Sequence, residues 1–213
     1  MSAALPPVIL VHGLWMHGVV MEWQRHYLAQ EGYDARCYSY STVAPTLTEN
    51  ALALAAYARE QGDAPMHWVG HSLGGLVILR MLECAPDLLV GRIVLLGTPS
   101  CGSGAARALS QHQLGGMAVG RSLAEWYARE APGDFSAREI GVIAGSNAFG
   151  LGLLVAPDLP EPNDGAVAVD ETRLAGARDH IVLPVNHSGM LFAHSVAVQT
   201  ATFLREGRFD HAA

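Results

Sequence analysis

The segment most suggestive of chemistry is Gly70-His71-Ser72-Leu73-Gly74. An apolar run over 66–70 precedes it, and an apolar run of helical period over 73–84 follows it. A G-x-S-x-G turn between a strand and a helix strains the backbone of the serine and exposes its hydroxyl at the helix N-terminus. Backbone N–H groups and the helix dipole favour negative charge there. The pattern predicts that Ser72 is a nucleophile and that the Leu73 N–H helps to bind an oxyanion.

The rest of the chain alternates short β-branched or aliphatic runs with longer stretches of helical period. This alternation predicts an α/β fold, a mostly parallel sheet of about six strands with helices on both faces. With 213 residues, half of them apolar, the chain fits a single domain over 1–213. Helices are expected over about 20–30, 47–61, 73–84 and 190–205. The expected strands are 7–12, 35–40, 66–70, 92–97, 140–145 and 180–185.

Together these features resemble the α/β-hydrolase superfamily, and the sequence GHSLGG at 70–75 is similar to the elbow of compact bacterial lipases and carboxylesterases. His12-Gly13 resembles the family's oxyanion loop, which implies that the Leu14 N–H is the second oxyanion donor and that His12 is a buried structural residue. Because the chain starts close to this loop, the family's leading antiparallel strands are expected to be absent. Cys101, in a segment similar to one of lipases, is expected near the site without a catalytic role.

The resemblance also implies the chain order serine, acid, histidine, with the histidine in a loop after the last strand. His187 fits that order as the general base, whereas His180 starts its strand and His71 is expected to point away from the hydroxyl. Asp164, followed by glycine, resembles the triad aspartate of lipases, although an Asp-Gly turn without chemistry is the alternative. The other acids considered, in order, are Asp170, Asp158 and Glu161.

The expected reaction is hydrolysis of a carboxylic ester through an acyl-enzyme, with no metal and no organic cofactor. A carboxylesterase or small lipase is the leading assignment. A thioesterase or an acyltransferase would use the same triad, and a binding protein that has kept the fold is the alternative from another class. The residues expected to line an acyl pocket are Trp15, Met16, Leu151, Leu153 and Leu154.

Residues 100–133 have two interpretations, helical packing on the sheet or a small flap beside the site. Polar residues interrupt this segment, so it makes a poor apolar cap. An open cleft and a preference for short to medium acyl chains are therefore expected.

A formal net charge of −7 argues against nucleic acid and anionic lipid as partners and favours a small, weakly charged ester. The N-terminal residues carry no basic region, and no apolar run is long enough for a membrane span. A cytoplasmic location without a transmembrane segment is expected. The oligomeric state has no signal in the sequence.

Overall fold

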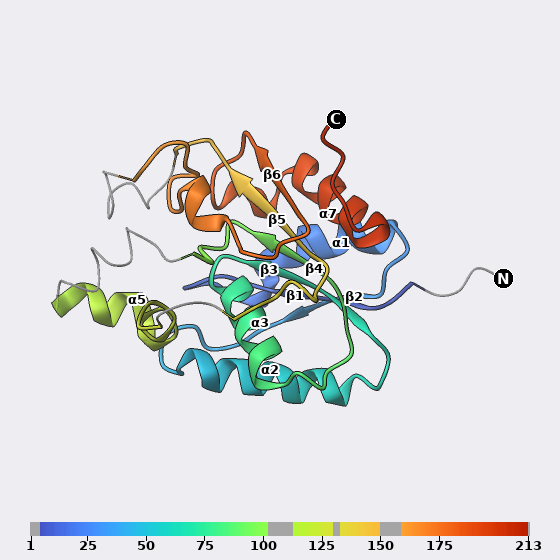
Figure 1. The fold of residues 1–213 in the computed structure, drawn as a ribbon, viewed down its shortest axis with the longest axis horizontal. Coiled ribbons are helices and arrows are strands. Elements are labelled where there is room, and N and C mark those ends of the chain that lie inside the picture. Colours follow the sequence, from blue (N-terminus) through green and yellow to red (C-terminus); the bar gives the residue numbers. More distant parts are fainter. Residues whose placement is uncertain (1–4, 102–112, 130–132, 150–158, 213) are drawn as a thin grey trace.

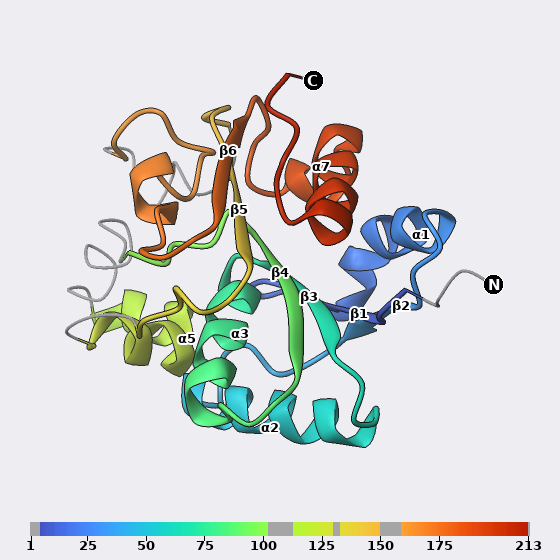
Figure 2. The same ribbon diagram turned by 45° about the vertical axis from the view of Figure 1, so that its right-hand side comes forward.

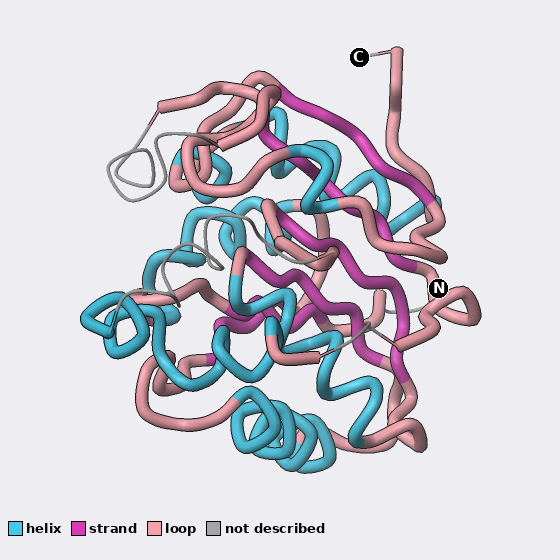
Figure 3. The backbone as a smooth tube through the Cα atoms, turned by 60° about the vertical axis from the view of Figure 1, so that its left-hand side comes forward, coloured by secondary structure: helices cyan, strands magenta, loops and turns pink. Residues whose placement is uncertain are grey.

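The structure is a computed structural model and describes residues 5–101, 113–129, 133–149 and 159–212. Its centre is a six-stranded sheet, whose strands are magenta in Figure 3. The strand order is β2-β1-β3-β4-β5-β6, and every pair of neighbouring strands is parallel. The strands are β1 (Val8–Val11), β2 (Ala35–Tyr38), β3 (Met66–His71), β4 (Val90–Leu96), β5 (Ile140–Gly145) and β6 (Asp179–Leu183). The predicted sheet is confirmed, and the described residues contain no antiparallel strand ahead of β1.

Helices cover both faces of this sheet (Figures 1 and 2). One face carries α1 (Glu22–Gln30) and α7 (His194–Glu206), and the other carries α2 (Leu47–Glu60), α3 (Leu73–Cys84) and α5 (Gln113–Tyr127). The first and last predicted helices are each divided, because the 3-10 helix η1 (Gly18–Met21) precedes α1 and the 3-10 helix η3 (Gly189–Leu191) precedes α7. Another 3-10 helix, η2 (Val169–Thr172), lies between β5 and β6.

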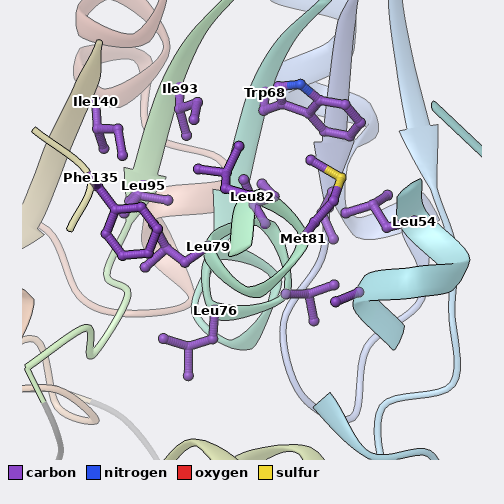
Figure 4. Close-up of a cluster of buried hydrophobic side chains, with 14 of the residues drawn as sticks. Leu54, Trp68, Leu76, Leu79, Met81, Leu82, Ile93, Leu95, Phe135 and Ile140 are labelled. Atoms are coloured by element: carbon purple, nitrogen blue, oxygen red, sulfur yellow. The ribbon is translucent and has the colours of Figure 1, made fainter. Parts of the chain in front are cut away.

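The larger core cluster fills the space between the sheet and helices α2 and α3 (Figure 4). Trp68 of β3 and Ile93 of β4 point into it from the sheet, and Leu76 and Leu79 enter it from α3. All six residues of β3 are buried, as expected for a central strand covered on both faces. The motif residue Ser72 therefore follows a fully buried strand and precedes a helix that is itself packed on the sheet.

The described part of the 100–133 segment is anchored to α2 and α3. Trp126 of α5 is buried in the larger core cluster. The Asn50 side chain of α2 donates a hydrogen bond to the Ser122 hydroxyl (3.0 Å), and Arg129 forms an ion pair with Glu83 of α3 (2.7 Å). Residues 120–129 thus pack as a fixed part of the helical layer.

His67 of β3 stabilises an irregularity in the neighbouring strand. The pairing of β3 and β4 shifts between Met66 and Trp68, so that Gly91 and Arg92 both lie opposite His67. The Arg92 N–H donates to Nδ1 of His67 (2.7 Å), and the imidazole is buried. Burial, and then the positive charge of Arg92, lower the pKa of His67 to about 4. The neutral ring is therefore the form that accepts this hydrogen bond.

A histidine whose pKa is lower in the folded state than in the unfolded state binds protons more readily when the protein unfolds. The neutral His67 side chain should make its full contribution to the unfolding free energy above about pH 6.5. This contribution should be lost as the pH falls towards 4. In His67→Asn, an uncharged acceptor replaces the imidazole. We expect the difference in unfolding free energy between pH 7 and pH 5, measured by urea titration, to shrink by about 1 to 2 kcal/mol.

The matched control is His26→Asn, on the exposed side of α1, which should keep the wild-type difference. Equal pH dependence in wild-type protein and His67→Asn would contradict the assignment.

Candidate active site

Ser72 lies in the turn between β3 and α3 with φ 53° and ψ −121°, a conformation that is costly for a residue other than glycine. Its backbone is held on both sides. The Ser72 N–H donates to the carbonyl of Leu96 in β4 (2.8 Å), and its own carbonyl accepts from the Thr98 hydroxyl (3.2 Å) and the Gly75 N–H (3.0 Å). The strained backbone of the half-buried serine is thus fixed by β4 and by the residues that follow it.

Glycines around Ser72 let three backbone segments approach each other. A Cβ atom on Gly70 would lie 2.6 Å from the Cα of Gly75, and a Cβ atom on Gly74 would lie 2.2 Å from the carbonyl oxygen of Val11. No side chain fits at either distance. The glycines of the predicted elbow are therefore required by close packing of the turn and α3 against β1.

His187 and Asp164 form a hydrogen-bonded pair, with His187 Nδ1 2.7 Å from Asp164 Oδ2. The Asp164 side chain is fully buried, and its other oxygen accepts the N–H groups of Ala166 (2.9 Å) and Val167 (2.7 Å). The His187 N–H also donates to the Asp164 carbonyl (2.9 Å). A carboxylate only accepts hydrogen bonds, so Nδ1 carries the proton and Nε2 of the neutral ring is left as an acceptor.

The pair and the elbow meet at the carboxyl edge of the sheet. Gly97, directly after β4, has φ 54°, and a Cβ atom there would lie 3.1 Å from both Asp164 Oδ2 and His187 Nδ1. On the other side, the His71 ring lies 4.8 Å from the His187 ring, one residue before Ser72. The structure thus pairs the acid and the histidine that the sequence singled out, and the residue before Ser72 lies against that histidine.

The loop after β1 lies against Ser72. A Cβ atom on Gly13 would lie 3.1 Å from the Ser72 Cβ atom, so the backbone of this loop contacts the serine directly. Leu14 is the next residue in the loop, and Leu73 is the first residue of α3. Within the described part of the chain, neither of their N–H groups donates to an acceptor. Both remain available to a bound oxygen atom.

His12 holds this loop from inside the protein. Its buried ring stacks on Tyr40 at 4.6 Å, Nδ1 donates to the Gly13 carbonyl (3.0 Å), and Nε2 accepts the Tyr40 N–H (3.3 Å). The Tyr40 hydroxyl donates to the His12 carbonyl (3.0 Å). His12 is the buried residue that the sequence predicted, and its ring nitrogens and carbonyl oxygen join this loop to Tyr40.

The predicted pocket residues fall into three groups. Trp15 is 66% exposed, and its backbone, with φ 56°, is held by a hydrogen bond from its N–H to the Thr42 hydroxyl (3.1 Å). Met16 is partly buried against the core cluster beneath α1 and α7. The remaining three, Leu151, Leu153 and Leu154, lie outside the described residues.

Among the described residues, no hydrogen bond or ion pair joins Asp170, Glu161 or His180 to the His187 ring. Asp170 is exposed and forms an ion pair with Arg173 (2.9 Å), and Glu161 is exposed. His180 is the second residue of β6, at the amino end of the strand as predicted, and contacts the Thr172 hydroxyl (2.9 Å). Asp158 lies outside the described residues.

Cys101 is exposed, and its thiol donates to the Arg173 carbonyl. No group of three or more His, Cys, Asp or Glu side chains in the described ranges could hold a metal ion. None of the helices in the part of the chain that the structure describes is long and apolar enough to cross a membrane.

Sequence reasoning missed the residues that hold the loops of the site. The buried Gln24 side chain of α1 donates to the carbonyl of Met190 (2.9 Å), and the Asn186 side chain accepts the N–H of Gly189 (2.7 Å). His71, considered only as a rival base, contacts the His187 carbonyl oxygen through Nε2 (3.0 Å). Most of these contacts join distant segments, so sequence spacing carried no signal for them.

Two named relatives match part of the chain. It is 33% identical over 99 residues to the pimeloyl-[acyl-carrier protein] methyl ester esterase of Methylococcus capsulatus, covering 44% of this chain and 38% of that protein. It is also 33% identical over 93 residues to lipase LipV of Mycobacterium tuberculosis, covering 41% and 36%. The matched region therefore spans little more than a third of either relative.

A solved structure resembles nearly the whole chain. The mature lipase BlEst2 of Bacillus licheniformis superposes with a TM-score of 0.76 at 21% identity, covering 97% of this chain and 93% of that one. At this identity the likeness shows a shared fold. Residues 8–203 match the family model described as the alpha/beta hydrolase family. This match takes in every strand of the sheet, the Ser72 turn and the His187–Asp164 pair, and the chain therefore belongs to the alpha/beta hydrolase family.

Proposed function

We propose that this protein is a serine hydrolase that cleaves carboxylic esters, with Ser72 as nucleophile, His187 as general base and Asp164 as the orienting acid. The observation that carries the proposal is the 2.7 Å contact between His187 Nδ1 and the buried Asp164 carboxylate, at the same sheet edge as the strained Ser72 turn. The names of the relatives, an esterase and a lipase, support ester hydrolysis.

In the first step, His187 Nε2 takes the proton of the Ser72 hydroxyl as its oxygen attacks the ester carbonyl carbon. The carbonyl oxygen becomes negative and is bound by the N–H groups of Leu14 and Leu73. His187 then gives the proton to the leaving alkoxide, so the alcohol departs and the acyl group stays on Ser72. The buried Asp164 carboxylate stabilises the imidazolium that forms between these transfers.

In the second step, water replaces the alcohol. His187 takes a proton from the water as its oxygen attacks the acyl carbon, and the same N–H groups bind the oxyanion. The bond to Ser72 breaks, the serine oxygen recovers the proton from His187, and the carboxylic acid leaves. The groups of the chain, together with water, suffice for this cycle.

The substrates we propose are small esters of short to medium acyl chains. The exposed Trp15 indole beside the oxyanion loop offers an apolar contact to an acyl chain. The anchoring of residues 120–129 on α2 and α3 argues against a large mobile cap formed by that stretch. A thioester substrate or an alcohol acceptor would use the same three residues.

Ser72→Ala should abolish ester hydrolysis and leave the fold intact, because the half-buried hydroxyl is not part of the core. Wild-type protein should form a covalent adduct with a fluorophosphonate probe, found at Ser72 by peptide mass spectrometry. Ser188→Ala, next to the base and exposed, is the matched control and should label normally. An adduct on another serine would refute the assignment of the nucleophile.

Asp164→Asn should lower kcat by about three to four orders of magnitude, because the amide can donate to His187 and favour the wrong tautomer. Asp170→Asn removes the runner-up acid and should keep kcat near the wild-type value. Steady-state kinetics on a p-nitrophenyl ester, with thermal melting to check folding, measures both. A mild Asp164→Asn together with a severe Asp170→Asn would show that the acid has been misassigned.

Across p-nitrophenyl esters from acetate to palmitate, kcat/KM should rise up to about fourfold per added methylene and then fall before palmitate. Trp15→Ala should flatten the rise. Leu89→Ala, equally exposed but just before β4 at the opposite edge of the sheet, should not. A maximum at palmitate, or a sharp increase at a dispersed lipid interface, would contradict the open cleft.

A further inference from the structure

His71 is the last residue of β3 and directly precedes Ser72. Its side chain is fully buried. Nε2 lies 3.0 Å from the backbone carbonyl oxygen of His187, a residue 116 positions further along the chain. The two imidazole rings lie 4.8 Å apart. The residue before the nucleophile thus reaches the loop that carries the base.

The direction of this hydrogen bond determines which nitrogen of His71 carries the proton. A carbonyl oxygen only accepts, so Nε2 is the protonated nitrogen and Nδ1 carries a lone pair. Nδ1 is buried without a partner in the described structure, and a Cβ atom on Gly13 would lie 2.9 Å from it. A proton on Nδ1 would have no acceptor there. Burial, and then the neighbouring His187, accordingly lower the pKa of His71 to about 3.

His71 is therefore unsuited to be the base itself. Nε2 already donates to the His187 carbonyl, and Nδ1 is enclosed against the oxyanion loop. What the ring does is occupy the space between Gly13 of that loop and His187. It thereby contacts both the loop after β1 and the loop that carries His187.

We infer that His71 is a positioning residue for the general base, holding the His187 carbonyl so that the imidazole stays aligned between Ser72 and Asp164. Asp164 already binds the N–H and the Nδ1 of His187, and His71 supplies the third contact, on the carbonyl side. A neutral donor suits this place, since a cationic side chain would oppose the imidazolium formed in catalysis. The inference rests on the proposed function for its catalytic consequence, but not for the contact itself.

Three substitutions separate the hydrogen bond from simple filling of space. In His71→Gln the amide nitrogen can occupy the position of Nε2 and still donate to the His187 carbonyl. In His71→Asn the side chain is one bond shorter and cannot reach it. His71→Leu fills the space without any donor. The Gln and Asn variants are both polar, so comparing them decides the question even if the Leu variant does not fold.

With a short p-nitrophenyl ester, we expect His71→Asn and His71→Leu to lower kcat by about ten- to a hundredfold, and KM by less than about threefold in either direction. His71→Gln should recover most of kcat. The rate of fluorophosphonate labelling at Ser72 should follow the same order. If His71 were merely structural, all three variants would lose thermal stability. The effect would not fall mainly on kcat, and His71→Gln would not restore it.

A second measurement does not depend on activity. In a Ser72→Ala background, proton NMR should show the His187 Nδ1–H bound to Asp164 as a downfield resonance, retained in His71→Gln and broadened or lost in His71→Asn. Folded Asn and Leu variants with wild-type kcat and an unchanged resonance would overturn the inference. If wild-type protein hydrolyses no ester or thioester, the proposed function fails, and the resonance still decides whether His71 positions His187.

Discussion

The site depends on one strained residue, Ser72, whose positive φ can persist only where the surroundings compensate for it. The compensation comes from backbone contacts with Leu96 and Gly75 and from the Thr98 hydroxyl. These contacts form because α3 packs almost directly on the backbone of β1, which only glycine at 74 allows. The strain of the turn is therefore balanced by the packing of the whole central layer.

The buried carboxylate of Asp164 is the second constraint. A fully buried charge is costly unless hydrogen bonds replace water, and here two backbone N–H groups and the His187 ring do so. Meeting this requirement also determines the tautomer of the ring, because the protonated Nδ1 leaves Nε2 as the acceptor. The contacts that satisfy the buried anion thus also leave the acceptor nitrogen that the proposed general base needs.

Parallel topology explains why these groups meet. In a parallel sheet every strand ends at the same edge, so the loops after β1, β3, β4, β5 and β6 all lie near each other there. The His71 and His187 rings lie 4.8 Å apart and connect the loop after β3 with the loop after β6. The resulting cluster is rigid because each loop is held by a neighbour rather than by its own turn alone.

Local patterns were sufficient to predict much of this arrangement. Strand positions follow from short apolar runs, and the expected helices follow from stretches of helical period. The Ser72 turn could be predicted because its glycines, strand and helix are contiguous in the chain. Chain order and family resemblance led to His187 and Asp164, and the structure shows them paired.

What the sequence by itself determined were the features encoded within one stretch of chain: the six strands, the main helices and the strained turn at Ser72. The tertiary structure alone decided how distant segments contact each other. It paired Asp164 rather than Asp170 with His187, joined His71 to the His187 carbonyl and placed the Arg92 N–H on His67. The physical reason is that local conformation depends on residues that are neighbours in the chain. The hydrogen-bond partner and the protonation of a buried polar group depend instead on which distant segments the folded sheet brings within hydrogen-bonding distance.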